Sequence, residues 1–190
     1  MRLARLAGVL TSVTVIACEH PFAPVPDPRL GRTSAFPLSG TEKESGGEDS
    51  GVTGAGQYNV NGLIVSFSID AENSKGEFSI YADEGGGLTV SFEAKVTCLS
   101  IDPVNHHAWI GGEIKENNST DPDLQGAIQQ KGRDIWFRVL DDPAGDRSTF
   151  VGFEGSGGFI TSADYCAGQP WAAGNARTWP VVSGDITIRP

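Results

Sequence analysis

The chain has 190 residues, and its 24 Asp and Glu against 14 Lys and Arg give a formal net charge of −10 at pH 7. Such a chain repels phosphate backbones, and its Lys and Arg are not clustered, which excludes nucleic acids and anionic lipid surfaces as electrostatic partners. The acidity mainly favours solubility.

The first segment of the chain, residues 1–17, is predicted to be a secretory signal peptide. Arg2 and Arg5 give it a positive start, and residues 6–17 form an apolar stretch without charge. This stretch is too short to span a bilayer, which needs about 20 apolar residues. Export of the protein is therefore expected.

The signal ends in Val15-Ile16-Ala17-Cys18, which resembles the lipobox of bacterial lipoproteins. The resemblance implies cleavage just before Cys18, diacylation of its thiol and acylation of its new amino terminus. Two or more acyl chains anchor a protein stably. We therefore expect a membrane-anchored protein of the bacterial cell envelope, with the lipid bilayer as a partner. If the host has two membranes, Glu19 after the cysteine indicates the outer membrane or the periplasmic face. The alternative is an ordinary signal peptide followed by an incidental cysteine.

Residues 18–54 are predicted to hold the lipidated cysteine and a disordered linker. The linker is rich in proline at first and then in Gly, Ser, Glu and Asp, without a sustained period of 2 or 3.6. This composition buries too little apolar surface to offset the entropy lost on ordering. A short docked strand at 35–38 is the alternative. The "GVTGAG" at 51–56 is not a phosphate-binding loop, because no hydrophobic strand precedes it and no helix follows.

Residues 55–190 are predicted to form one all-β domain. Apolar and polar residues alternate in "LIVSFSIDA", "EFSIYA" and "LTVSFEAKVTCLSI", as half-buried strands require. Alternation places Cys98 on the inward face with Val96, and its change of phase after Cys98 predicts a bulge or bend nearby. Further strands are expected in "HAWIGGEIKE", "RDIWFRVLDD", "STFVGF" and "SGDITIRP". At most a short helix is expected, around residues 121–130.

Seven or eight short antiparallel strands joined by tight turns predict a small β-barrel, with a β-sandwich as the alternative. The barrel is preferred because pairing of the first and last strands would remove both sheet edges. Residues 154–182 interrupt the strands as a long, glycine-rich excursion. It is long enough to need a special explanation.

Cys98 and Cys166 remain as a pair once Cys18 is assigned to lipid, and in an oxidising compartment we expect them to be bonded. A bridge across 68 residues (166 minus 98) would stabilise the fold by about 4 kcal/mol in the chain-entropy model. It would also fasten the excursion to the domain. Two buried free thiols are the alternative, and without a histidine cluster the pair makes a poor zinc site.

Several stretches of the domain, "KVTCLSID", "AWIGGEI", "FRVLDDPAGD" and "SGDITI", together with a later cysteine, resemble a family of secreted bacterial β domains of unknown function. In that family a "V-x-C-L" strand precedes a "G-N-x-A-x-I-G-G" hairpin and an aspartate-rich turn. Here the hairpin has Asn105-His106-His107 in place of "G-N". The resemblance covers about residues 55–190. It implies a β fold and export, and it brings no catalytic or binding residue.

No catalytic residue is assigned. His106 and His107 are neighbours in the chain, so on a strand they would point to opposite faces and could not easily chelate one metal ion. As turn residues after Pro103 they are expected to be solvated. The glycine-x-serine-x-glycine elbow of serine hydrolases is missing from the sequence.

Two turns are acidic: one contains Asp141, Asp142 and Asp146, and the other contains Asp121 and Asp123. Their carboxylates could bind calcium, but neither turn matches the twelve-residue calcium loop. Local hydrogen bonding explains such Asp-Pro turns without a metal. We therefore expect neither a metal site nor a cofactor.

The large aromatic side chains of Tyr81, Trp109 and Trp136 fall on strand faces opposite the predicted core. Exposed together, they would form a surface that could stack a sugar, a peptide or a protein partner. The alternative is that the excursion, which carries Trp171 and Trp179, folds back over this outer face and buries it.

These features predict a membrane-anchored extracytoplasmic lipoprotein that acts as a non-catalytic binding or structural module of the envelope. Its expected partner is a glycan, peptidoglycan or a protein. The alternative is a small extracytoplasmic enzyme, such as a hydrolase, whose catalytic residues are unidentified. A deep pocket with a shifted acid or histidine would favour the enzyme, and a flat aromatic patch would favour the module.

Overall fold

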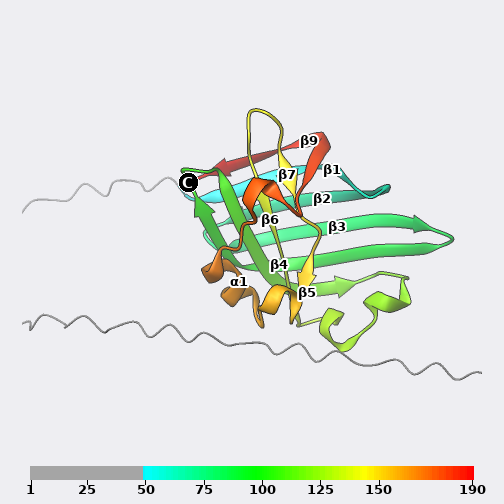
Figure 1. The fold of residues 1–190 in the computed structure, drawn as a ribbon. Helices are drawn as coiled ribbons and strands as arrows, with labels where there is room; N and C mark the ends of the chain where they lie inside the picture. The colour runs from blue at the N-terminus through cyan, green and yellow to red at the C-terminus, as the bar shows by residue number, and fades with distance from the viewer. Residues whose placement is uncertain (1–48) are drawn as a thin grey trace, which may run out of the picture. The chain divides into compact units, whose positions relative to one another are not determined.

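The computed structural model describes residues 49–190, whose antiparallel strands close into a barrel (Figure 1). The strands are β1 (Gly51–Val60), β2 (Leu63–Glu72), β3 (Lys75–Gly85), β4 (Leu88–Asp102), β5 (His107–Asn117), β6 (Asp134–Leu140), β7 (Arg147–Ser148), β8 (Gly152–Phe153) and β9 (Trp179–Arg189). Their order is β5-β4-β3-β2-β1-β9-β7-β6, and β5 also pairs with β6, which completes a ring of eight strands. β8 is an extra strand beside β6. The predicted barrel is confirmed, and the sandwich alternative is excluded.

The predicted signal peptide, Cys18 and residues 18–48 of the predicted linker lie outside the described residues. Among the helices that the structure describes, none combines the length and the apolarity needed to cross a membrane.

β1 begins at Gly51, whereas the β domain was predicted to begin at Ala55. β1 pairs with β2 on one side and with β9 on the other, so the first and last strands close the barrel as expected. A Cβ atom at Gly54 would lie 2.4 Å from the backbone oxygen of Asp185 on β9. Glycine therefore allows the two strands to come close, but it also removes the apolar alternation that would have predicted a strand.

Short hairpins join the first strands and set their register. β1 and β2 are connected by Asn61 and Gly62, with φ values of 53° and 100°. β2 and β3 are connected by Asn73 and Ser74, with φ values of 49° and 61°. Left-handed backbone at both central residues matches the twist of the flanking strands. These turns place the alternating residues of consecutive strands on the same face.

The core fills the interior of the barrel, and it is built from the inward residues that alternation predicts. On β2, β3 and β4 these residues are exposed by no more than 4%. They are Val65, Phe67, Ile69, Ala71, Phe78, Ile80, Ala82, Val90, Phe92, Ala94 and Val96.

The predicted irregularity near Cys98 is present, because the register between β4 and β5 shifts between Val96 and Cys98. Its effect differs from the prediction, which placed Cys98 on the inward face. The shift turns Cys98 outward into a second hydrophobic cluster, whereas Leu99 and Ile101 pack against the barrel core. A bulge reverses which residues face inward, so the side of the sheet on which Cys98 lies depends on the exact place of the extra residue.

The excursion after β8 forms a layer on the outside of the barrel. It contains η3 (Ser156–Gly158), α1 (Ser162–Gly168) and η4 (Ala173–Asn175), and β9 already begins at its end. Figure 1 shows α1, in orange, against the strands that the contacts identify as β4, β5 and β6. The predicted short helix at 121–130 appears as η1 (Pro122–Leu124) and η2 (Ala127–Gln129).

α1 was not predicted, although its start has a sequence signal. The Thr161 hydroxyl accepts a hydrogen bond from the Asp164 N–H, and the Asp164 carboxylate accepts one from the Thr161 N–H. This capping box satisfies two of the free donors at the helix start. Gly111 on β5 makes room for the helix, because a Cβ atom there would lie 2.7 Å from the Cβ atom of Ser162.

Candidate functional site

The candidate site lies where the strand that follows β6 is broken. β7 and β8 both pair with β6, but residues 149–151 between them leave the ladder. The Thr149 hydroxyl accepts a hydrogen bond from the Arg138 N–H at 3.1 Å, and the Thr149 N–H donates to the Arg138 carbonyl at 3.1 Å. From inside the barrel, the Tyr58 hydroxyl donates to the Thr149 carbonyl at 2.9 Å. The backbone of the break is thus held in place without a continuous strand.

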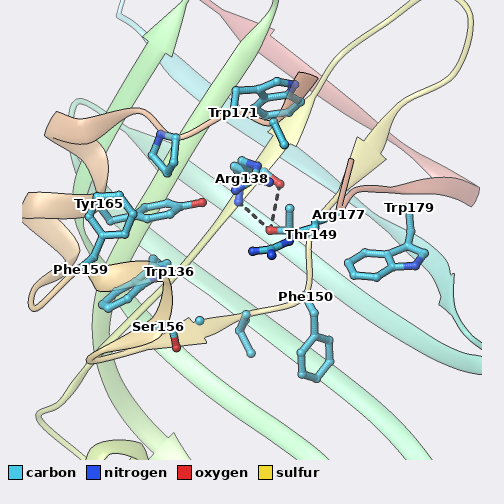
Figure 2. Close-up of a pocket in the computed structure, with 15 residues that line it drawn as sticks. Trp136, Arg138, Thr149, Phe150, Ser156, Phe159, Tyr165, Trp171, Arg177 and Trp179 are labelled. Carbon is cyan, nitrogen blue, oxygen red and sulfur yellow. Dashed lines mark hydrogen bonds between the residues drawn. The ribbon is translucent and has the colours of Figure 1, made fainter. Parts of the chain in front are cut away.

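A pocket of about 530 Å³ opens at this break, between the barrel wall and the excursion (Figure 2). Its volume lies within the range of about 300–1,000 Å³ that is usual for small-molecule sites. Its walls come from β6, from the break between β7 and β8, from the excursion and from the start of β9. Six of the lining residues are aromatic: Trp136, Phe150, Phe159, Tyr165, Trp171 and Trp179.

The aromatic wall continues into a buried cluster outside the barrel. Trp109 and Trp136 are exposed by only 2% and 3%, and they pack with Tyr165 and Cys166. The rings of Trp136 and Tyr165 are stacked, with centroids 5.5 Å apart. The Trp109 indole N–H donates to the carbonyl of Pro170 in the excursion at 2.9 Å.

The three aromatic residues proposed as a binding surface therefore do not form one exposed row. The excursion buries Trp109 and Trp136, as the alternative expected, and Tyr81 alone of the three is exposed, at 48%. Of the two tryptophans in the excursion, Trp171 packs on the outer cluster. Trp179 packs against the barrel core and stacks on Tyr58.

The predicted disulfide between Cys98 and Cys166 is present, with Cα atoms 6.2 Å apart. It joins the outward side of β4 to α1. A Cβ atom at Gly111 would lie 2.6 Å from the Cys98 sulfur, so the glycine makes room for the bridge as well as for the helix. The bridge fixes the excursion over the outer cluster beside the pocket.

The two histidines have different surroundings. His106 is exposed, as predicted, but the His107 ring stacks on Trp171 with centroids 3.6 Å apart. Burial lowers the pKa of His107 below its usual value, and the positive charge of Arg138 lowers it further, whereas the charge of Asp102 opposes both effects. The prediction that both side chains are solvated is therefore wrong for His107.

Arg138 and Arg177 are the charged residues that line the pocket. The Arg138 guanidinium lies 5.2 Å from the ring centroid of Trp171, which is the geometry of a cation–π contact. Its Nε atom is buried and has no hydrogen-bond partner within the described part of the chain. Arg177 is exposed and follows η4.

The groups that line the pocket are poorly suited to transferring protons at neutral pH. Among residues 49–190, no Asp, Glu or His lines it. Burial raises the pKa of Tyr165 to about 12, so its hydroxyl stays protonated at neutral pH. The Ser156 hydroxyl accepts a hydrogen bond from the Phe153 N–H, and no general base lines the pocket to activate it. The arrangement is suited to holding a ligand.

The acidic turn after β6 bonds to the protein itself. The Asp146 carboxylate accepts a hydrogen bond from the Ile186 N–H at 2.7 Å, and the Asp141 carboxylate accepts one from the Ile188 N–H at 2.9 Å. Asp142 also accepts a backbone bond within the turn. Burial raises the pKa of Asp146 above its usual value. Local hydrogen bonding thus accounts for these carboxylates.

The second acidic turn has a similar local role, because the Asp121 carboxylate accepts a hydrogen bond from the Asp123 N–H at the start of η1. Across residues 49–190, no three or more His, Cys, Asp or Glu side chains are grouped so that they could hold a metal ion.

The sequence offered one signal for the pocket that was missed. Arg138 lies two residues after Trp136 on β6 and therefore shares its outward face. The contributions of Phe159, Tyr165 and Arg177 had no such signal, because they depend on how the excursion folds. No protein-family model matches the chain, and comparison with curated proteins and with solved structures found no match either.

Proposed function

We propose that this protein is a membrane-anchored lipoprotein of the bacterial cell envelope whose barrel is a non-catalytic, ligand-binding module. The observation that carries the proposal is the aromatic-walled pocket of about 530 Å³ at the broken strand. The pocket has the size and the apolar walls of small-molecule sites, and a few polar groups converge on it.

The position of the pocket supports a role in binding. The interior of the barrel is filled by core side chains, so a ligand is expected at the wall and not inside. The pocket is open to solvent beside the exposed residues of the excursion. A small molecule could enter it, and so could one residue of a glycan or a peptide.

The walls of the pocket are held before any ligand arrives. The disulfide fixes α1 to β4, and Arg147 binds the excursion through two hydrogen bonds to Thr178, of 2.7 and 2.9 Å. The Trp109 indole adds the bond to Pro170. A preformed site loses less conformational entropy on binding, so more of the contact energy is retained as affinity.

The anchoring part of the proposal rests on the lipobox-like residues that end at Cys18 and on the resemblance to secreted β domains. A lipid anchor, followed by a linker, would keep the module at the envelope surface while the pocket faces the aqueous phase. A disulfide in the folded part agrees with an oxidising compartment.

The test uses one variant that fills the pocket and one matched control. Ala172 lines the pocket, so Ala172→Trp places a large side chain in it. Ala167 is exposed on the same excursion and does not line the pocket, so Ala167→Trp adds the same bulk elsewhere. Full-length wild type and both variants, held in nanodiscs, are mixed with fractions of a small-molecule extract of bacterial envelopes, and their Tm is measured.

A ligand that binds only the folded state raises Tm. We expect at least one fraction to raise the Tm of the wild type and of Ala167→Trp but not that of Ala172→Trp. If no fraction raises Tm, or if all three proteins respond equally, the pocket is not the binding site and the proposal fails.

A further inference from the structure

We infer that the ligand of this pocket is an anion with a flat apolar or aromatic group, and that Arg138 binds its charge. The inference rests on the proposed binding function and narrows the ligand to one chemical class. It follows from the charge of the pocket, from the surroundings of Arg138 and from the shape of the walls.

The pocket is positively charged in a protein that is strongly negative overall. The charged residues that line it, Arg138 and Arg177, are both cationic, and none of the carboxylates in the described part of the chain is in its lining. The salt bridges found in residues 49–190 use other cations, namely Lys115, Arg133 and Arg189. Carboxylates are plentiful in residues 49–190, yet none of those described forms a salt bridge with Arg138 or Arg177. A cleft lined by charge of one sign concentrates ligands of the opposite sign.

The surroundings of Arg138 leave part of its bonding capacity unused among the described residues, although the guanidinium also contacts the Tyr165 side chain. The Arg138 side chain is half-buried, and the buried Nε atom has no hydrogen-bond partner among the described residues. Buried donors rarely lack a hydrogen-bond partner, and each exception needs an explanation. A planar guanidinium presents several N–H groups in a fixed fork that matches a carboxylate or a similar oxyanion in two parallel hydrogen bonds. A bound oxyanion would satisfy these donors.

The neighbours of Arg138 fix its direction. The guanidinium packs over the Trp171 ring, whose other contacts include the stacked ring of His107. Figure 2 shows Arg138 between Trp171 and the Thr149 side chain, whose hydroxyl accepts a hydrogen bond from the backbone N–H of Arg138. Stacking restrains the long side chain, so less entropy is lost when it binds a charged group.

The rest of the wall is suited to a flat apolar group beside the charge. Trp136, Phe159 and Tyr165 contribute ring surfaces on one side of the pocket, and Phe150 and Trp179 contribute them on another. Aromatic rings bind flat groups by offset or edge-to-face packing. A ligand with a charged end and a flat body can therefore use Arg138 and the rings together.

Arg177 has a smaller role because it is exposed. A charge in contact with water is screened by salt, so its contribution to affinity is less than that of a half-buried charge. We expect Arg177 to attract the anion to the entrance and Arg138 to hold it.

The experiment compares two probes that differ in charge but hardly in shape: 2-naphthoate, which is an anion, and 2-naphthamide, which is neutral. Full-length protein in nanodiscs of zwitterionic phosphatidylcholine is titrated with each probe by calorimetry, and empty nanodiscs serve as the blank. We expect 2-naphthoate to bind about tenfold more tightly or better, since the charge-assisted bonds to Arg138 are absent for the amide. Raising NaCl from about 50 mM to about 500 mM should weaken the naphthoate and leave the amide unchanged.

Three variants assign the preference to a residue. Arg138→Gln should remove the preference for the anion, so that 2-naphthoate and 2-naphthamide bind this variant with similar Kd values. Arg177→Gln should weaken the naphthoate only about two- to threefold, as expected for an exposed charge. Lys131→Gln removes an exposed cation that does not line the pocket, and it should change neither Kd. The Tm of each variant without probe shows that it is folded.

Equal affinities for the two probes, or a preference that survives Arg138→Gln, would overturn the ligand class and leave the proposed function standing. Binding that Ala172→Trp does not reduce would place the probes outside the pocket and overturn the inference as well. If neither probe binds, the inference fails, and the envelope-fraction experiment then shows separately whether the pocket binds another class of ligand.

Discussion

Carboxylate side chains accept the backbone hydrogen bonds of β9 on the edge that has no neighbouring strand. This strand pairs with β7 only over its first two residues. Farther along, the N–H groups of Ile186 and Ile188 donate to the carboxylates of Asp146 and Asp141, in place of the carbonyl groups of a neighbouring strand. The acidic turn after β6 is therefore a structural element of the barrel closure, and it bonds to β9 where the pairing of β9 with β7 has ended.

We expect Asp146→Ala to lower the free energy of unfolding by about 1–3 kcal/mol, because it leaves the N–H groups of Ile186 and Asp142 without their acceptor. Asp146→Asn keeps one carbonyl oxygen and should cost less. Asp185→Ala, at an exposed position on β9, is the control and should stay within about 0.5 kcal/mol of the wild type. Urea unfolding measures all three, and equal losses for Asp146→Ala and Asp185→Ala would contradict the role of the carboxylate.

His107 makes the contact between β5 and the excursion sensitive to pH. Its pKa in the folded protein is lowered, first by burial and then by Arg138. Just below the usual histidine pKa of about 6.5, His107 therefore binds more protons in the unfolded chain than in the folded protein. The stability that neutral His107 contributes is complete above that pH and is lost as the pH falls through the lower, folded-state pKa.

The expected result is that the segment around Trp171 exchanges its amide hydrogens faster at pH 5 than at pH 7, because a protonated His107 beside Arg138 disfavours the stack. Hydrogen exchange followed by mass spectrometry, corrected for the intrinsic pH dependence of exchange, measures this opening. His107→Phe can stack but cannot titrate, so its protection should not depend on pH over this range. The same pH dependence in His107→Phe would show that another group is responsible.

At the scale of elements, the excursion is a cover that one covalent bond and several local contacts fasten to a complete barrel. Most strand pairs of the barrel do not use the excursion. The exceptions lie where β9 begins: Trp179 and Pro180 pair with β7, and Val181 pairs with Tyr58 on β1. The capping box of α1, the bridge to Cys98 and the Trp109 bond to Pro170 all act on the cover itself. The cover and the barrel should therefore differ in stability.

The double variant Cys98→Ser, Cys166→Ser should loosen the cover and leave the barrel folded. Trypsin should cleave after Arg177 faster than in the wild type, and the tryptophan emission should shift to longer wavelength as Trp109 and Trp136 meet water. The far-ultraviolet circular dichroism should hardly change. The free energy of global unfolding should fall by about 4 kcal/mol, since the bridge closes a loop of 68 residues.

Reductant added to the wild type should reproduce these changes, and it should have no effect on the double variant, which serves as the control. Loss of all strands in one cooperative step on reduction would show that the cover and the barrel are one unit. Unchanged emission and cleavage would show that the local contacts hold the cover without the bridge.

At the scale of the whole molecule, the prediction concerns the anchor, which lies outside the described residues. Cys18→Ala removes the thiol that would be acylated, so it should abolish incorporation of labelled palmitate and release the protein from tight membrane association. Metabolic labelling and fractionation measure both effects. A cysteine change in the folded domain, the double serine variant above, should keep the label. Palmitate on Cys18→Ala would refute lipidation at this residue.

β2, β3 and β4 could be predicted from alternation, because a half-buried strand requires apolar residues at every second position whatever its neighbours are. β1 could not be predicted in this way. Its glycines, such as Gly54, allow close approach to β9, and glycines interrupt the alternation of apolar and polar residues. The single strand predicted in "STFVGF" is wrong, because residues 149–151 leave the ladder between β7 and β8. The disulfide could be predicted from the expected oxidising compartment and from the two cysteines that remain after Cys18, neither of which depends on the fold. α1 was missed because seven residues carry too little periodicity to stand out, although its capping box is visible in the sequence.

The sequence by itself determined the all-β class, which follows from local patterns, and it favoured the closed barrel over a sandwich and the pairing of Cys98 with Cys166 over free thiols; the structure decided both. Only the tertiary structure decided the side of the sheet on which Cys98 lies, because one extra residue in β4 reverses the faces after it. It also decided the pocket, whose Arg138 and Trp171 lie 33 residues apart in the chain (171 minus 138). A site made from both a strand and a folded-back excursion exists only when the two are packed together, and no local pattern records that packing.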